Sequence, residues 1–342
     1  MAFRLLHSIF TGTRQPGKFD KELMLKAIER VVDGTDPRLR AVSHYRRNLW
    51  NGVERAIDFV VAFVNALPPA IVADTRSYLT NPHMRALFAS PDHLREILSF
   101  STGMRNYLKQ TPAPLPAEIY AGLGAFRVEK KTLGIAMDGE ILRRDVPQTS
   151  VSFCDHRLVC LTDHEETTRR ELMQRGFDYL IATALRLLTT SRVHKTQLEQ
   201  QQRQLLQQKA DLLKKGQVGL ETLTTPAITN ATDLAAVEQQ LQDLENELSQ
   251  LRADSATLDN HLAKIAATLS EPEKHLQLES VTLTLDPMNI KVPPDSLKVA
   301  NAMTFNEIVM SEDRRLAALF IRFPSDALLP QSDFLDRADI VL

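Results

Sequence analysis

The feature that most constrains the fold of this chain is a heptad pattern that runs from Phe177 to Leu269 and is interrupted once. In its second half, apolar residues alternate at spacings of three and four, and only Ser255 departs from apolar. This spacing is typical of the a/d seam of a coiled coil. The seam positions of this half are Leu234, Val237, Leu241, Leu244, Leu248, Leu251, Ser255, Leu258, Leu262, Ile265 and Leu269.

The first half of the pattern keeps the same rhythm with more polar residues. Its seam positions are Phe177, Leu180, Ala184, Leu187, Ser191, His194, Leu198, Gln201, Leu205, Gln208 and Leu212. The two halves match in length, which predicts an antiparallel hairpin within one chain, because two unrelated helices need not match. With the bend centred near Thr224, Leu205 falls opposite Leu244 and Leu198 opposite Leu251. A parallel homodimer would use the same leucines, so the heptads leave a homo-oligomer open.

The composition is that of an ordinary globular protein. The chain has 342 residues, 43% of them hydrophobic and 25% charged, which gives room for about two to three domains. The formal net charge of −2 argues against nucleic acid as the partner. Two cysteines, Cys154 and Cys160, do not make a disulfide framework, so we expect a reducing, cytoplasmic compartment. We expect neither a signal peptide nor a transmembrane helix.

Residues 1–110 are predicted to form a helical domain. Asp20, Asn81 and Ser90 are placed to cap helices, and the latter two are followed by a proline at a favoured first-turn position. A further helix is expected from Arg38 to Leu67, with an apolar stripe along one side. The segment 111–118 has three prolines and is predicted to be an extended linker.

The sequence on both sides of the heptads is typical of strands. Residues 119–162 contain short β-branched or alternating runs, with turn signals at Asp138–Gly139 and around Asp155, which predict hairpins. Residues 276–342 contain the alternating VTLTL and the apolar RRLAALFIRF. We therefore predict an α+β fold. A small antiparallel sheet-containing domain, formed by 119–162 and 276–342, is interrupted by a helix and antiparallel coiled-coil hairpin at 163–275.

One cluster of residues is a candidate metal site. Cys154, His156, Cys160 and His164 offer four ligands of the kind that a tetrahedral zinc site uses, and on one strand the first three would point the same way. The spacing matches no established zinc pattern, however, and one strand cannot wrap four ligands around an ion. The competing interpretation is structural: small core cysteines, a turn at Asp155, and a cap for the following helix.

Two further surfaces are candidates for binding. Arg46 and Arg47 lie near Tyr45 and Trp50, where arginines beside aromatics can contact bases or an anionic membrane, although such charges more often form a solvated helix face. The stretch from Phe3 to Phe10 could lie on a membrane surface, or else dock on the protein's own core.

The sequence favours an interaction protein over an enzyme. It contains no P-loop, no nucleophile elbow and no His-Glu-x-x-His pair. We expect a non-enzymatic cytoplasmic scaffold whose coiled-coil arm binds a protein partner, with contacts at Arg46 and Arg47 and at Leu220 and Leu223 in the tip loop. The alternatives are a metal-dependent enzyme with its site near Cys154–Glu166 and a peripheral membrane-associated adaptor.

Overall fold

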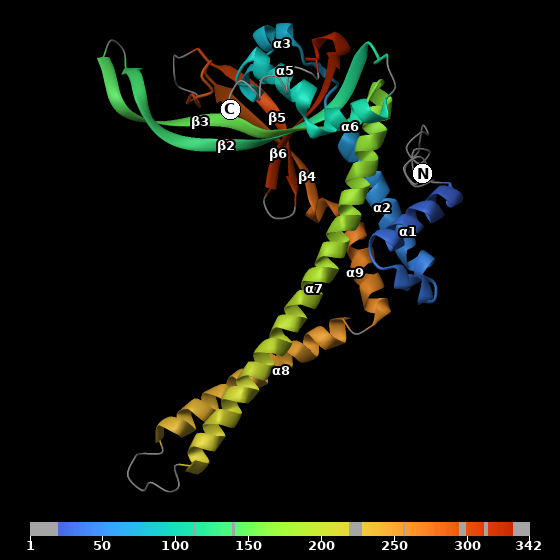
Figure 1. The fold of residues 1–342 in the computed structure, drawn as a ribbon, viewed down its shortest axis with the longest axis vertical. Helices are drawn as coiled ribbons and strands as arrows, with labels where there is room; N and C mark the ends of the chain where they lie inside the picture. Colours follow the sequence, from blue (N-terminus) through green and yellow to red (C-terminus); the bar gives the residue numbers. More distant parts are fainter. Residues whose placement is uncertain are drawn as a thin grey trace. The chain divides into compact units, whose positions relative to one another are not determined.

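The computed structural model describes residues 20–111, 114–138, 141–218, 228–255, 257–293, 299–310 and 314–330 (Figure 1). The helices are α1 (Lys21–Gly34), α2 (Tyr45–Asn65), α3 (Thr75–Thr80), α4 (Pro82–Leu87), α5 (Pro91–Phe100), α6 (Thr102–Gln110), α7 (Glu165–Val218), α8 (Ile228–Ser255) and α9 (Leu258–Ser270), with 3-10 turns η2 (Pro37–Ala41), η4 (Pro272–Lys274) and η5 (Ser325–Ala327). The strands are β1 (Ile71–Val72), β2 (Glu118–Asp138), β3 (Ile141–Thr162), β4 (Leu276–Leu285), β5 (Asn301–Met310) and β6 (Arg314–Pro324). The α+β fold class is therefore confirmed.

The predicted caps of three N-terminal helices are confirmed. The side chain of Asp20 accepts a hydrogen bond from a first-turn amide of α1, Asn81 does the same for α4, and Ser90 does so for α5. Each satisfies an amide that the helix itself leaves without a partner.

The predicted helix from Arg38 to Leu67 is shorter than expected. Residues 37–41 form η2, and α2 begins only at Tyr45. Between them His44 has a φ of 60°, a left-handed conformation that a continuous helix cannot contain. The chain therefore turns before α2.

Within the described residues, six strands form one sheet in the order β3-β2-β6-β5-β4, and β1 pairs with β6 (Figure 1). The β1–β6 pair is parallel and the others are antiparallel. Strands β2 and β3 precede the long helices and β4, β5 and β6 follow them, so the sheet is interrupted in the sequence as predicted. Strand β5 was not predicted.

Of the two turn signals in 119–162, the one at Asp138–Gly139 agrees with the antiparallel pairing of Asp138 with Ile141, but the hairpin predicted around Asp155 is wrong, because β2 and β3 form a single long hairpin. Its register shifts at three places, and at each place β3 has an extra residue with positive φ: Asp145, Asp155 and Cys160. These are β-bulges, which bend and twist a strand without ending it. Asp155 therefore lies in a bulge and not in a turn.

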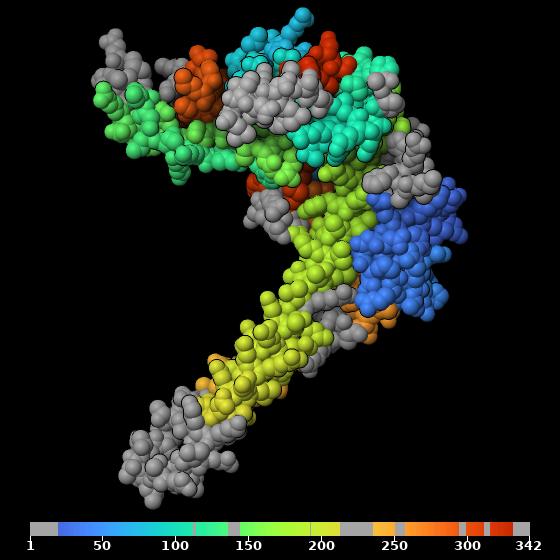
Figure 2. Space-filling model, in the orientation of Figure 1, coloured from blue at the N-terminus to red at the C-terminus, as the bar shows by residue number. Residues whose placement is uncertain are grey.

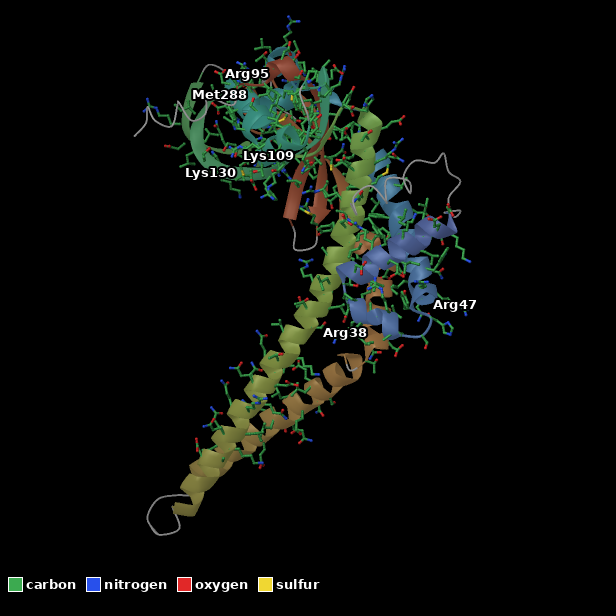
Figure 3. All side chains as sticks on the ribbon, turned by 45° about the vertical axis from the view of Figure 1, so that its right-hand side comes forward. Arg38, Arg47, Arg95, Lys109, Lys130 and Met288 are labelled. Atoms are coloured by element: carbon green, nitrogen blue, oxygen red, sulfur yellow. The ribbon has the colours of Figure 1, made fainter. Side chains whose placement is uncertain are left out.

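The hairpin continues past the end of β6 as a long ribbon, and β3 also bridges Ile290 at Ser150. Strand β6 pairs with β2 only as far as Phe126, and Figure 1 shows β2 and β3 extending beyond it. Lys130, labelled in Figure 3, lies on this ribbon. Leu133 and Ile135 on the ribbon are 69% and 59% exposed.

Helices α4, α5 and α6 share one apolar core with the sheet. The core side chains from the helices include Leu87 and Leu94, that of Phe88 comes directly after α4, and those from the strands include Phe305 and Phe323. At Gly103 in α6, an added Cβ would lie 2.0 Å from the carbonyl oxygen of Leu158, so only glycine allows this approach of α6 to β3.

Contacts divide the described chain into two compact units. The sheet unit contains residues 56–178 and 272–330, and the helical unit contains residues 20–55 and 179–271. The boundaries fall inside α2 and α7, so each of these helices contributes residues to both units. The domain boundaries drawn from the sequence stay predictions.

In the helical unit, α7 and α8 pair antiparallel as predicted, and near Lys209 the contacts fall within two residues of the predicted register, whereas His194 contacts Glu247 and not the region around Asp254. We call residues 179–218 of α7 together with α8 the arm. Lys209 Nζ lies 2.7 Å from Glu238 Oε1, and Gln202 donates a hydrogen bond to Glu245 over 3.4 Å. The seam residues Leu198, Leu241 and Leu248 are buried.

The second helix of the predicted hairpin is not continuous. It is divided into α8 and α9, and Thr257 caps α9 by accepting a hydrogen bond from the amide of Asn260. The division follows Ser255, the polar seam position, where Asp, Ser and Thr favour local hydrogen bonds over helix. On α7 the predicted seam residue Leu187 is exposed and Leu188 is buried instead.

Candidate functional site

The structure does not bring the four predicted zinc ligands together. Among the described residues, no group of three or more His, Cys, Asp or Glu is placed to hold a metal ion. Cys154 is exposed, and the Nδ1 atom of His164 lies 2.8 Å from Asp163 Oδ1. The side chains of His156 and Cys160 face two different parts of the sheet unit, because bulges in β3 change the direction in which its side chains point.

His156 faces the helices of the sheet unit. Its ring stacks on Phe88 with a centroid distance of 4.9 Å, and its Nε2 atom lies 2.8 Å from the carbonyl oxygen of Leu87. The ring of His93 meets it edge-on at 5.3 Å. Burial lowers the pKa of His156, and the nearby His93 lowers it further. The imidazole is therefore a partly buried group that packs against the helices, and not a metal ligand of a cluster in the described chain.

Cys160 faces α7 instead. Burial raises the pKa of its thiol to about 12, and the carboxylate of Glu171 adds to the rise. A thiol of this kind stays protonated and is a poor nucleophile and metal ligand. The bulge at Asp155 adds one residue between Cys154 and the later positions. The side chains that a regular strand would align therefore point to different faces.

The sheet unit contains a charged pair that the sequence did not reveal. Glu307 is fully buried, and both of its oxygens accept hydrogen bonds from Arg127, over 2.5 Å and 3.1 Å. Arg127 also pairs with Glu129, which accepts from Lys291. A buried carboxylate held this way is satisfied by protein groups, so we interpret the pair as structural.

The predicted basic surface forms a groove in the helical unit. The groove is open and has a volume of about 600 Å³. It is lined by Lys21, Leu25, Arg46, Arg47, Asn48, Trp50 and Asn51. We call it the cationic groove. It contains both arginines that the sequence singled out, and Lys21, which it did not.

The arginines of the cationic groove differ in their surroundings. Arg46 donates to Glu29 over 2.9 Å and 3.0 Å, and Glu29 also binds Tyr45 and Arg40. Arg47, labelled in Figure 3, is exposed, and it has no ion pair with any described residue. The sequence signal for this difference is weak, because Arg46 and Arg47 are adjacent and look equivalent.

A second groove runs along the arm. Its volume is about 410 Å³, and it is lined by Gln201, Gln204, Leu205 and Gln208 of α7 and by Gln240, Asp243, Leu244 and Glu247 of α8. We call it the arm groove. In Figure 2 the described arm residues of α7, in yellow-green to yellow, face the viewer. Val193 and Leu206 of α7 are 51% and 49% exposed.

The arm groove has an acidic wall. The charged residues of α8 are Asp233, Glu238, Asp243, Glu245, Glu247, Asp254 and Arg252. His194 Nε2 lies 3.2 Å from Glu247 Oε1, although the sequence predicted it near Asp254. The acidic bias of α8 was not predicted, although it is visible in the sequence, because it lies at positions that flank the heptad seam.

Other predicted contact residues fall outside the described part of the chain. These are Leu220 and Leu223 of the tip loop and the stretch from Phe3 to Phe10. In the part that is described, no helix has the length and apolar character required to cross a bilayer. Comparison with known proteins gives no match to any family model, curated protein or solved structure.

Proposed function

We propose that this chain is a non-enzymatic interaction protein whose arm binds a protein partner. The arm groove carries this proposal, because two paired helices leave Leu205 and Leu244 accessible from one side. An amphipathic helix is the partner that fits such a groove, with apolar residues packed against these leucines. Since Asp243 and Glu247 form the wall, Lys or Arg beside the apolar residues of the partner would complement it.

The arrangement of α8 supports this surface over its opposite side. Glu238 and Glu245 lie on the other flank of α8 and face Lys209 and Gln202 of α7. Asp243 accepts a hydrogen bond from Gln239, a neutral side chain of its own helix. Glu247 lies 3.2 Å from His194 Nε2 of α7, so among the described residues neither groove carboxylate has a Lys or Arg partner, whereas Glu238 on the other flank pairs with Lys209.

The test uses two double variants of the full chain with the same change in charge. Asp243→Asn with Glu247→Gln alters the arm groove, and Glu238→Gln with Glu245→Gln alters the other flank. Each variant is used to capture proteins from the native cell, and circular dichroism confirms that the helices form. We expect a partner that is retained by the wild type and the flank variant and lost from the groove variant. Equal capture by all three proteins would contradict the proposal.

A further inference from the structure

We propose that the cationic groove binds a phosphate monoester group whose attached body packs on Trp50. This inference does not depend on the arm, because the described residues that line the groove belong to α1 and the first turns of α2.

The charges of the cationic groove are unbalanced. Lys21, Arg46 and Arg47 line it, and no acidic residue is among the described residues that do. Glu29 offsets Arg46, but neither Lys21 nor Arg47 has an ion pair with a described residue. Cations gathered around one groove repel one another, and a bound anion would relieve that repulsion.

The position of the arginines adds to the imbalance. Arg46 and Arg47 lie in the first turn of α2, which contains no acidic residue. The amides of a first turn carry a partial positive charge, so arginines there are unfavourable for the helix itself. No nearby carboxylate of the described chain offsets the unfavourable position of Arg47 at the start of α2. Residues that are locally unfavourable in this way are often found at binding sites.

The remaining lining residues indicate the class of ligand. Asn48 and Asn51 offer side-chain amide donors, which together with guanidinium groups suit the oxygens of a phosphate. Trp50 is half-buried and lies with Leu25, so one part of the groove is apolar. A volume of about 600 Å³ is ample for a phosphate with a ring or an acyl chain attached.

Such a phosphate could belong to a soluble molecule or to a lipid headgroup, and one measurement separates the two. Trp50 is the only tryptophan of the chain, so its fluorescence reports on the groove directly. Adenosine monophosphate represents the soluble source, with adenosine as its uncharged counterpart. Phosphatidylcholine vesicles that contain phosphatidic acid represent the lipid source, with pure phosphatidylcholine vesicles as their counterpart.

We expect a saturable change in Trp50 fluorescence with at least one phosphate source and none with its counterpart. Arg47→Gln should weaken that binding about tenfold, because a charge-assisted hydrogen bond is lost. Arg203→Gln is the matched control, because Arg203 is an exposed arginine of the arm and its substitution removes the same charge. No change with either source would overturn the proposal, and so would equal weakening by the two substitutions.

Discussion

The sheet unit and the helical unit bury their apolar residues in different ways. In the sheet unit, side chains such as Phe305 and Phe323 are enclosed between strands and helices and are 1% exposed. In the arm, two helices meet along one line, so Leu205 and Leu244 stay half-exposed and border a groove. Side chains enclosed on several sides make close contacts that stabilise the sheet unit. Helices that touch along one line leave apolar surface of the arm available for a partner.

The largest expected effect separates these two kinds of core. Phe305→Ala removes a ring that packs on Phe153 and His83, and it should lower the free energy of unfolding by about 3–5 kcal/mol. Leu248→Ala in the arm should cost about 2 kcal/mol, near the lower end for leucine, because the open pair can relax around the loss. Urea unfolding followed by circular dichroism measures both. A larger loss for Leu248→Ala would break the comparison.

The buried charges of the sheet unit provide the next test. Arg127→Met leaves the carboxylate of Glu307 buried without its bidentate partner, which should cost about 3–5 kcal/mol. The double variant with Glu307→Leu should recover most of that loss, because neither charge then remains in the core. Urea unfolding gives the free energy of unfolding of both variants. It shows whether the two charges stabilise the sheet unit only as a pair. Equal stability of the single and double variants would contradict the structural interpretation.

The two units should also respond to acid at different pH. The pKa of His156 in the sheet unit is lowered by burial, so the unfolded chain takes up this proton first as the pH falls. Stability should therefore decline as the pH drops below about 6.5. His156→Gln should remove that decline. Urea unfolding midpoints measured between about pH 8 and about pH 5, a range that spans the ordinary pKa of histidine, test this.

In the helical unit the acid response should come later. The Arg38 guanidinium beside Asp36 holds the pKa of that carboxyl well below its usual range, and His261 Nδ1 lies 3.5 Å away. The stabilisation is present above the ordinary aspartate pKa of about 4 and is lost as the pH falls through the lowered value. Trp50 lies in the same unit, so its fluorescence follows this loss. If both units began to lose stability near neutral pH, the predicted difference in their response to acid would be wrong.

The smallest expected effect tests the register of the arm. Lys209→Glu places like charges opposite each other at Glu238 and should cost about 0.2–1 kcal/mol, because exposed ion pairs contribute little. Combining it with Glu238→Lys should restore the stability. If the swapped pair stays as weak as the single variant, the two side chains are not neighbours in solution.

The parts of the fold that the sequence could predict are those with local or periodic signals. Capping side chains at Asp20 and Ser90 and the seam at Leu241 and Leu248 follow from spacing along the chain. Strand β5 and the length of the β2–β3 hairpin could not be predicted. The bulges at Asp155 and Cys160 resemble turns in the sequence and are strand in the structure.

The candidate binding surfaces show the same limit. Arg46 and Arg47 were identified from the sequence, because cations beside aromatic residues are visible there. Lys21 joins them only because α1 and α2 pack together, and the arm groove exists only because α7 and α8 pair. Conversely, the four predicted zinc ligands are close in sequence, but bulges of β3 separate Cys154, His156 and Cys160, and His164 lies beyond the end of that strand.

The sequence by itself therefore determined an α+β chain in which two matched heptad segments interrupt a sheet. Periodicity, caps and turn residues are local properties, and they act before any distant contact forms. Only the tertiary structure decided where the second helix of the hairpin divides, which faces β3 presents, and that Glu307 is buried against Arg127. These outcomes depend on residues far apart in the chain, whose mutual burial no local pattern encodes.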